Sequence, residues 1–158
     1  MAAILLVDDD DLFRSLVGMF LDTAGHVCSE AVSVAQARAW LMTKKFDLVL
    51  SDFNMPRETG LDLLRHVQGE YPATPFIMIT GETNPAVRRE ALNMGAQECI
   101  IKPFRMWSLL KSVARALSKG SQQGPRELVR RPLTLPMTSR PNKSIRSLNL
   151  SSRKACEL

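Results

Sequence analysis

The sequence lacks the features that mark several large classes of protein. Its three cysteines are odd in number and show no C-x-x-C spacing, which argues against a disulfide framework and a zinc site. No apolar run approaches the roughly 20 residues that a membrane span requires. The chain also opens without the basic stretch of a secretory signal. We therefore expect a cytoplasmic protein that does not insert into a membrane.

The excess of positive charge is confined to the end of the chain. Residues 120–158 contain eight Lys and Arg against two acids, whereas residues 1–119 contain 13 against 14. The last stretch also holds four prolines and six serines without sustained periodicity, so it is predicted to be a disordered tail. This stretch has no aromatic residues for base stacking and no helix-turn-helix pattern. Its positive charge is therefore the one feature that favours binding to nucleic acid.

Short apolar runs alternate with amphipathic segments throughout residues 1–119. Strands are expected at 2–7, 26–31, 46–51, 75–80 and 98–101, and a segment with helical spacing follows each of them. Five such units predict an α/β fold, in which a doubly wound parallel sheet carries helices on both faces. Apolar residues recur with helical spacing in the first helix, and Trp107 lies on the apolar stripe of the last, where we expect it to pack. The stripe of the first helix consists of Leu12, Phe13, Leu16, Val17, Phe20 and Leu21.

Polar residues follow four of the predicted strands, at the point where each strand ends. Asp8 and Asp9 follow the first, Asp52 the third, Thr80 closes the fourth, and Lys102 follows the fifth. In open parallel sheets the carboxyl edge of the strands is where ligands bind. The sequence therefore predicts a functional site at this edge.

Several carboxylates at one edge would repel one another and raise each other's pKa values. A divalent cation removes that repulsion, and oxygen ligands suit Mg²⁺, which takes one or two protein carboxylates and keeps several waters. Asp10 and Asp11 instead fall at the start of the first helix, where the helix dipole favours negative charge. An alternative is that all four aspartates of residues 8–11 only cap that helix.

The motifs around these positions resemble those of a known family. The segments "LLVDDDD", "DLVLSDFNMP", "MITGE" and "CIIKPF" look like the receiver domain of bacterial two-component response regulators, in particular the single-domain chemotaxis type. The resemblance covers about residues 2–119. It implies a flavodoxin-like sheet of five parallel strands in the order 2-1-3-4-5.

The resemblance also implies a role for each matching residue. Asp52 would accept a phosphoryl group from the phosphohistidine of a histidine kinase. Asp8, Asp9 and Asp52 would bind Mg²⁺ together with the backbone carbonyl of Asn54. Lys102 would contact a phosphoryl oxygen.

Four further positions are implied to modulate this chemistry. Thr80 would turn its hydroxyl toward the phosphorylated aspartate and so move the loop that follows it. A cis peptide before Pro103 would aim Lys102 into the site. Glu82 and Asn54 are polar, which suggests rapid loss of the phosphoryl group to water. Cys99 stands where receivers usually carry an aromatic switch residue, and we expect it to be a small core residue.

Partners follow from the same resemblance, and several alternatives stay open. We expect a histidine kinase as phosphodonor and a downstream protein that binds the surface of helix 84–94, strand 98–101 and the last helix. Formation of a homodimer is an alternative. The domain is not expected to be an enzyme on external substrates, because Asn54 replaces the second acid of aspartyl-phosphate phosphatases. Nucleotide-binding loops are missing as well. The tail could add polyanion binding, or the chain could be a fragment of a larger regulator.

Overall fold

The computed structural model describes residues 1–120, in which five strands alternate with five helices. The strands are β1 (Ala3–Val7), β2 (Val27–Ala31), β3 (Leu48–Asp52), β4 (Phe76–Thr80) and β5 (Glu98–Ile101). The helices are α1 (Asp11–Thr23), α2 (Val34–Thr43), α3 (Gly60–Glu70), α4 (Pro85–Asn93) and α5 (Met106–Gly120). Each predicted strand–helix unit is present, and the predicted α/β class is confirmed.

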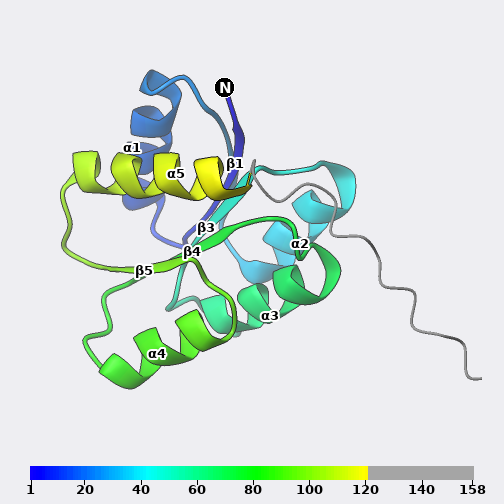
Figure 1. Ribbon diagram of the computed structural model, residues 1–158, viewed down its shortest axis with the longest axis vertical. Coiled ribbons are helices and arrows are strands. Elements are labelled where there is room, and N and C mark those ends of the chain that lie inside the picture. Colours follow the sequence, from blue (N-terminus) through cyan, green and yellow to red (C-terminus); the bar gives the residue numbers. More distant parts are fainter. Residues whose placement is uncertain (121–158) are drawn as a thin grey trace, which may run out of the picture. The chain divides into compact units, whose positions relative to one another are not determined.

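All five strands belong to one parallel sheet in the order β2-β1-β3-β4-β5, as predicted (Figure 1). In the register of β3 and β4, Asp52 lies opposite Ile79. In that of β4 and β5, Thr80 lies opposite Ile101. The ends of the central strands are therefore aligned, so Asp52 and Thr80 reach the same edge of the sheet.

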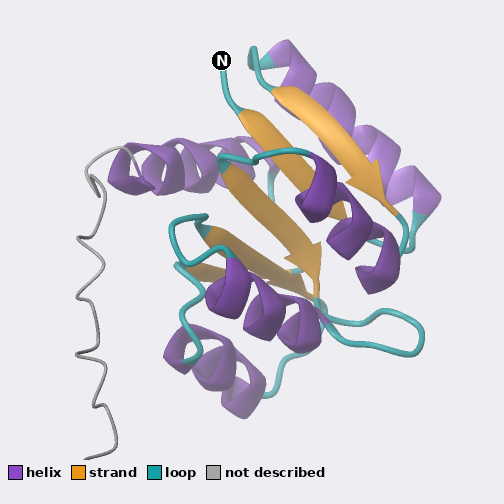
Figure 2. Cartoon of the chain, turned by 90° about the vertical axis from the view of Figure 1, so that its right-hand side faces the viewer, coloured by secondary structure: helices purple, strands orange, loops and turns teal. Residues whose placement is uncertain are grey.

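Helices cover both faces of the sheet (Figure 2). Each face carries its own apolar core because the central strands are buried on both sides. One core packs α2, α3 and α4 against the sheet around Leu5, Val49 and Phe76. The other packs α1 and α5 around Ile4, Leu50 and Ile79. These three-layer contacts hold the strand ends in fixed positions.

Short-range polar contacts set where the helices begin. Asp10 caps α1, because its carboxylate accepts from the backbone N–H groups of Leu12 and Phe13 at 3.0 and 3.1 Å. This confirms the expectation that Asp10 and Asp11 belong to the start of the first helix. Thr59 and Asp62 form a capping box at α3.

Three side chains of the predicted apolar stripes do not pack into the core. Leu12 and Leu16 of α1 are 84% and 42% exposed, and Trp107 of α5 is 60% exposed. The buried stripe of α1 instead runs through Arg14, Val17, Gly18 and Leu21. A helix buries one face only, and the apolar residues of α1 extend beyond the face that meets the sheet.

None of the helices within residues 1–120 is long and apolar enough to cross a membrane. The predicted disordered tail, and with it the predicted boundary near residue 119, involves residues 121–158, which lie outside the described part of the chain.

Candidate functional site

Two buried carboxylates share one lysine at the carboxyl edge of the sheet. The Lys102 Nζ atom lies 2.7 Å from Asp52 Oδ1 and 3.0 Å from Asp8 Oδ2. Asp8 and Asp52 are only 2% and 5% exposed. We call Asp8, Asp52 and Lys102 the carboxylate–lysine cluster. The cluster joins the ends of β1, β3 and β5. Asp8 and Lys102 are 94 residues apart in the sequence.

Backbone groups hold the carboxylates of the cluster in place. The Asp10 N–H donates to Asp8 Oδ1 at 2.8 Å, and the Asn54 N–H donates to Asp52 Oδ2 at 2.7 Å. Each carboxylate therefore uses one oxygen for a backbone N–H and directs the other toward Lys102. This arrangement restricts both side chains to one orientation.

The carboxylate–lysine cluster contains two negative groups and one positive group. Burial raises the pKa of Asp52, and the nearby charge of Asp8 adds to this rise, although Lys102 and the Asn54 N–H oppose it. For Lys102, burial alone would lower the pKa, but the hydrogen bonds and charges of Asp52 and Asp8 raise it. One ammonium facing two buried carboxylates leaves the cluster short of positive charge. The site therefore favours an additional cation.

Thr80 lies at the end of β4, beside the cluster. It is 1% exposed, and its hydroxyl oxygen accepts from the Glu82 N–H at 2.9 Å. The hydroxyl thus caps the loop between β4 and α4. Any change in the orientation of Thr80 would release the Glu82 N–H and alter this loop.

The structure places the remaining predicted residues in different surroundings. Asp9 is exposed beside Asp8, and the side chain of Asn54 is also exposed. Within residues 1–120, no group of three or more His, Cys, Asp or Glu side chains is arranged to hold a metal ion. The peptide bond between Lys102 and Pro103 is cis, as predicted.

Cys99 is a core residue, as expected from its small size. It is 5% exposed and packs into the core shared by α2, α3 and α4. Burial raises the pKa of its thiol, although Arg88 partly opposes the rise. A buried thiol with a raised pKa has little reactive thiolate, which argues against a redox role.

Two residues of the site were missed by the sequence analysis. The Lys102 Nζ atom lies 4.0 Å from the centre of the Phe13 ring, a cation–π distance. The Arg14 guanidinium donates from Nη1 to the backbone oxygen of Asp8 at 2.8 Å. The helical spacing of Arg14 with Val17, Gly18 and Leu21 is the signal that could have revealed its burial.

The fold and the cluster together define the class of the protein. Its doubly wound sheet matches that of CheY-like flavodoxin-fold structures. One is the chemotaxis response regulator CheY4 of Vibrio cholerae (TM-score 0.69, 36% identity, 73% of this chain and 98% of that chain). Another is a CheY-like receiver domain protein from Methanospirillum hungatei (TM-score 0.75, 27% identity, 78% and 99%). The chain belongs to the response regulator receiver domain family, whose model matches residues 4–114.

Longer regulators carry similar domains. The phosphate regulon transcriptional regulatory protein PhoB of Pseudomonas aeruginosa is 33% identical over 130 residues, which is 79% of this chain and 57% of PhoB. The transcriptional regulatory protein ResD of Bacillus subtilis is 33% identical over 119 residues, or 75% and 49% of the two chains. The chain thus spans about half the length of these curated relatives. Within the family, it is a signalling module.

Proposed function

We propose that this chain is a phosphoacceptor of two-component signal transduction and that Asp52 is the residue modified. The observation that carries the proposal is the carboxylate–lysine cluster, in which Lys102 lies 2.7 Å from the buried Asp52. A carboxylate oxygen of Asp52 attacks the phosphorus of a kinase phosphohistidine. A P–O bond forms, the P–N bond breaks, and the imidazole leaves with the electron pair of that bond.

Lys102 has two tasks in this scheme. Before transfer, its ammonium offsets the charges of Asp8 and Asp52, to which it is bonded. After transfer, it binds an oxygen of the phosphoryl group as a point charge. Asp9 and Asn54 are exposed, so the phosphodonor would approach the cluster from their side.

The donor atoms of the site suit Mg²⁺. Asp8, Asp9 and Asp52 would supply carboxylate oxygens and the Asn54 carbonyl a neutral one, a donor set that matches the hard-oxygen preference of this ion. The raised pKa of Asp52, caused by burial and then by Asp8, fits a site that is completed by a further cation. When bound, the ion neutralises charge on the transferred phosphoryl group.

The proposal is tested by intact mass spectrometry of the full chain with acetyl phosphate. We expect the mass of one phosphoryl group to be gained in the presence of Mg²⁺ and not with EDTA. Hydroxylamine should remove the added group, because it cleaves acyl phosphates. No gain in mass at saturating phosphodonor and Mg²⁺ would contradict the proposal.

We also expect the phosphorylated form to be short-lived. Asn54 and Glu82 lie two residues beyond Asp52 and Thr80, and both present polar groups that can orient water. Replacing Asn54 with methionine should lengthen the half-life several-fold, which is measurable by the decay of the phosphorylated mass after the donor is removed. A half-life of hours for the parent would contradict this prediction.

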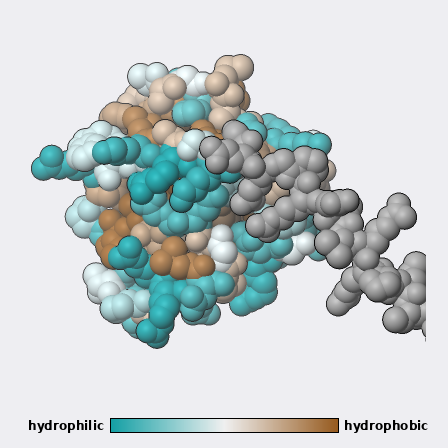
Figure 3. All heavy atoms as spheres, viewed as in Figure 1, coloured by the Kyte–Doolittle hydropathy of each residue, from teal (hydrophilic) through white to brown (hydrophobic). Residues whose placement is uncertain are grey.

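We propose that the switch is transmitted from Thr80 to a cytoplasmic protein partner through α4, β5 and α5. Hydrophobic residues are exposed between α4 and α5 along β5 (Figure 3). Leu92, Ile101 and Trp107 of these elements are 40%, 40% and 60% exposed. An exposed apolar surface of this kind suits a protein partner or a second copy of the chain.

A further inference from the structure

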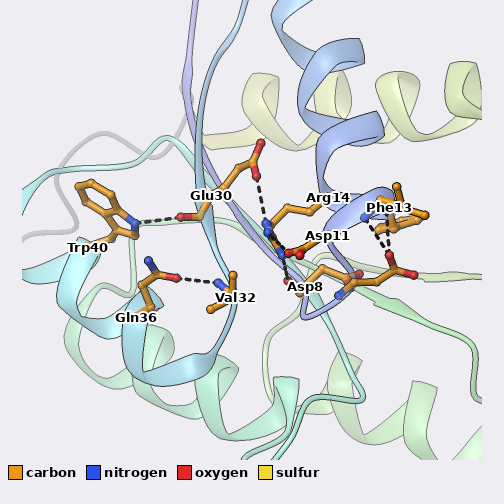
Figure 4. Close-up of polar contacts among 10 residues, drawn as sticks. Asp8, Asp11, Phe13, Arg14, Glu30, Val32, Gln36 and Trp40 are labelled. Atoms are coloured by element: carbon orange, nitrogen blue, oxygen red, sulfur yellow. Dashed lines mark hydrogen bonds and ion pairs between the residues drawn. The ribbon is translucent and has the colours of Figure 1, made fainter.

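Arg14 is a buried arginine that links three elements next to the carboxylate–lysine cluster. It projects from α1 and is 8% exposed. Its Nη1 donates to the backbone oxygen of Asp8 at 2.8 Å, and its Nε donates to Glu30 Oε2 on β2 at 3.0 Å. Nη2 forms an ion pair with Asp11. Figure 4 shows the guanidinium between these three partners.

The bond to the Asp8 carbonyl constrains the backbone that carries both aspartates. This oxygen belongs to the peptide unit that links Asp8 to Asp9, and that unit is planar. Arg14 therefore helps to fix the plane, and with it the direction in which the chain reaches Asp9. Because the Asp8 carboxylate is also held by the Asp10 N–H at 2.8 Å, Asp8 is restrained at its backbone and at its side chain.

Glu30 connects Arg14 to the sheet. It lies on β2 opposite Leu6 of β1, and its backbone oxygen accepts from the Trp40 Nε1 of α2 at 3.0 Å. The backbone that carries Glu30 is thus held by the sheet and by a second helix, and the Arg14 guanidinium is bonded to the carboxylate of that residue. Arg14 can therefore restrain the loop that carries Asp8 and Asp9, because its partner Glu30 lies on β2 and not in that loop.

Arg14 and Lys102 act on Asp8 in different ways. Lys102 contacts the carboxylate, at 3.0 Å from Oδ2, whereas Arg14 contacts the backbone oxygen. Arg14 thus orients the backbone of Asp8 and leaves both carboxylate oxygens of Asp8 free of contact with its guanidinium.

We propose that Arg14 is a positioning residue that holds the Asp8–Asp9 peptide in the orientation needed to bind Mg²⁺. This inference rests on the proposed function, in which these two aspartates are metal ligands. Outer residues that orient metal ligands typically contribute about 10- to 100-fold to metal affinity. The structure assigns Arg14 this kind of task through its backbone contact.

The test is calorimetric titration of the full chain with Mg²⁺ alone, without a phosphodonor. We expect Arg14→Met to raise the dissociation constant about tenfold or more. Arg14→Lys, which keeps the charge and a single donor nitrogen, should fall between this variant and the parent. Glu30→Gln keeps a hydrogen-bond acceptor for Arg14 and should have a smaller effect than Arg14→Met.

A matched variant separates positioning from a general loss of stability. Val67→Ala removes buried apolar volume from α3, on the other face of the sheet, and should lower the melting temperature without changing Mg²⁺ affinity. All titrations are made at a temperature where every variant is folded by circular dichroism. A folded Arg14→Met with the parental affinity would overturn the inference, as would an equal loss of affinity in Val67→Ala.

The two proposals fail in different ways. If the parent binds Mg²⁺ and becomes phosphorylated while Arg14→Met binds Mg²⁺ equally well, only the positioning role is lost. If the parent neither binds Mg²⁺ nor gains a phosphoryl group, the proposed function is wrong and the role of Arg14 is overturned with it.

Discussion

Asp52→Asn is expected to abolish phosphorylation of the chain by acetyl phosphate. The amide has no anionic oxygen to attack phosphorus, although it fills the same volume as the carboxylate. The other members of the cluster stay in place, because Lys102 keeps its contact with Asp8 at 3.0 Å. Intact mass spectrometry with Mg²⁺ should show the added group on the parent and none on the variant.

The matched control is Asp22→Asn, which removes an exposed carboxylate of α1 and should leave phosphorylation unchanged. Modification of Asp52→Asn to the same extent as the parent would mean that another residue accepts the group. Peptide mapping of the modified variant would then identify the true acceptor.

The same substitution should stabilise the fold at neutral pH. Burial, followed by the charge of Asp8, raises the pKa of Asp52 in the folded chain, so folding disfavours its ionised form. The contribution of protonated Asp52 to the free energy of unfolding is fully present below its pKa in the unfolded chain, about 3.9. This contribution is lost as the pH rises through the higher pKa that Asp52 has in the folded chain. Asparagine resembles the protonated acid at every pH, so it avoids this loss.

The gain should therefore be present at pH 7 and shrink as the pH falls through the raised pKa toward the unfolded value. Its size should lie within the roughly 0.5–3 kcal/mol that single substitutions usually change. Urea unfolding of both proteins at pH 7 and near pH 4 measures it. A variant that is less stable than the parent at pH 7 would contradict the assigned electrostatics.

Gly60→Ala is expected to be strongly destabilising. A Cβ atom at this position would lie 2.3 Å from the backbone oxygen of Asp52, 2.7 Å from Met78 Sδ and 3.1 Å from Phe53 Cα. Two of these atoms belong to the backbone and cannot turn aside. We expect a loss of about 3 kcal/mol in the free energy of unfolding, measured by urea denaturation. Since the clash is with Asp52 itself, phosphorylation of the folded fraction should also fall.

Gly69→Ala is the control within the same helix. No heavy atom lies within 4 Å of a Cβ built on Gly69, so the extra methyl group meets open space. Alanine should stabilise α3 by about 0.5–1 kcal/mol, because glycine in a helix has more backbone freedom to lose. Equal stability of Gly60→Ala and the parent would show that the approach of α3 to the end of β3 is looser than described.

The sheet and the cluster were accessible from sequence because both depend on the chain's local order. Apolar runs that are buried on two faces stand out as strands, and parallel pairing brings the charged residues after them to one edge of the sheet. The strand order that makes these residues neighbours was implied by the family resemblance. Asp8, Asp52 and Lys102 could be grouped in this way although they are far apart in the chain. The distances from Lys102 Nζ to Asp52 (2.7 Å) and to Asp8 (3.0 Å) depend on the register of the strands, so they could not be predicted from the sequence.

The errors concern which face of a helix meets the sheet. Leu12 and Trp107 belong to the apolar stripes predicted from helical spacing, yet they are 84% and 60% exposed. Arg14 was overlooked because a charged residue is rarely buried unless it is paired. Asp11 pairs with it within α1, but the partner that ties it to the sheet, Glu30, lies 16 residues away. Pairing between elements is a tertiary property, and spacing along one helix does not encode it.

The polar character of α4 has an energetic consequence. Ala91 is the one buried residue of this helix in the described structure. Little apolar surface would be hydrated if α4 shifted or opened, so its local opening free energy lies well below that of the whole domain. A modest chemical change elsewhere in the domain can then shift the balance among conformations of α4 without disrupting the sheet.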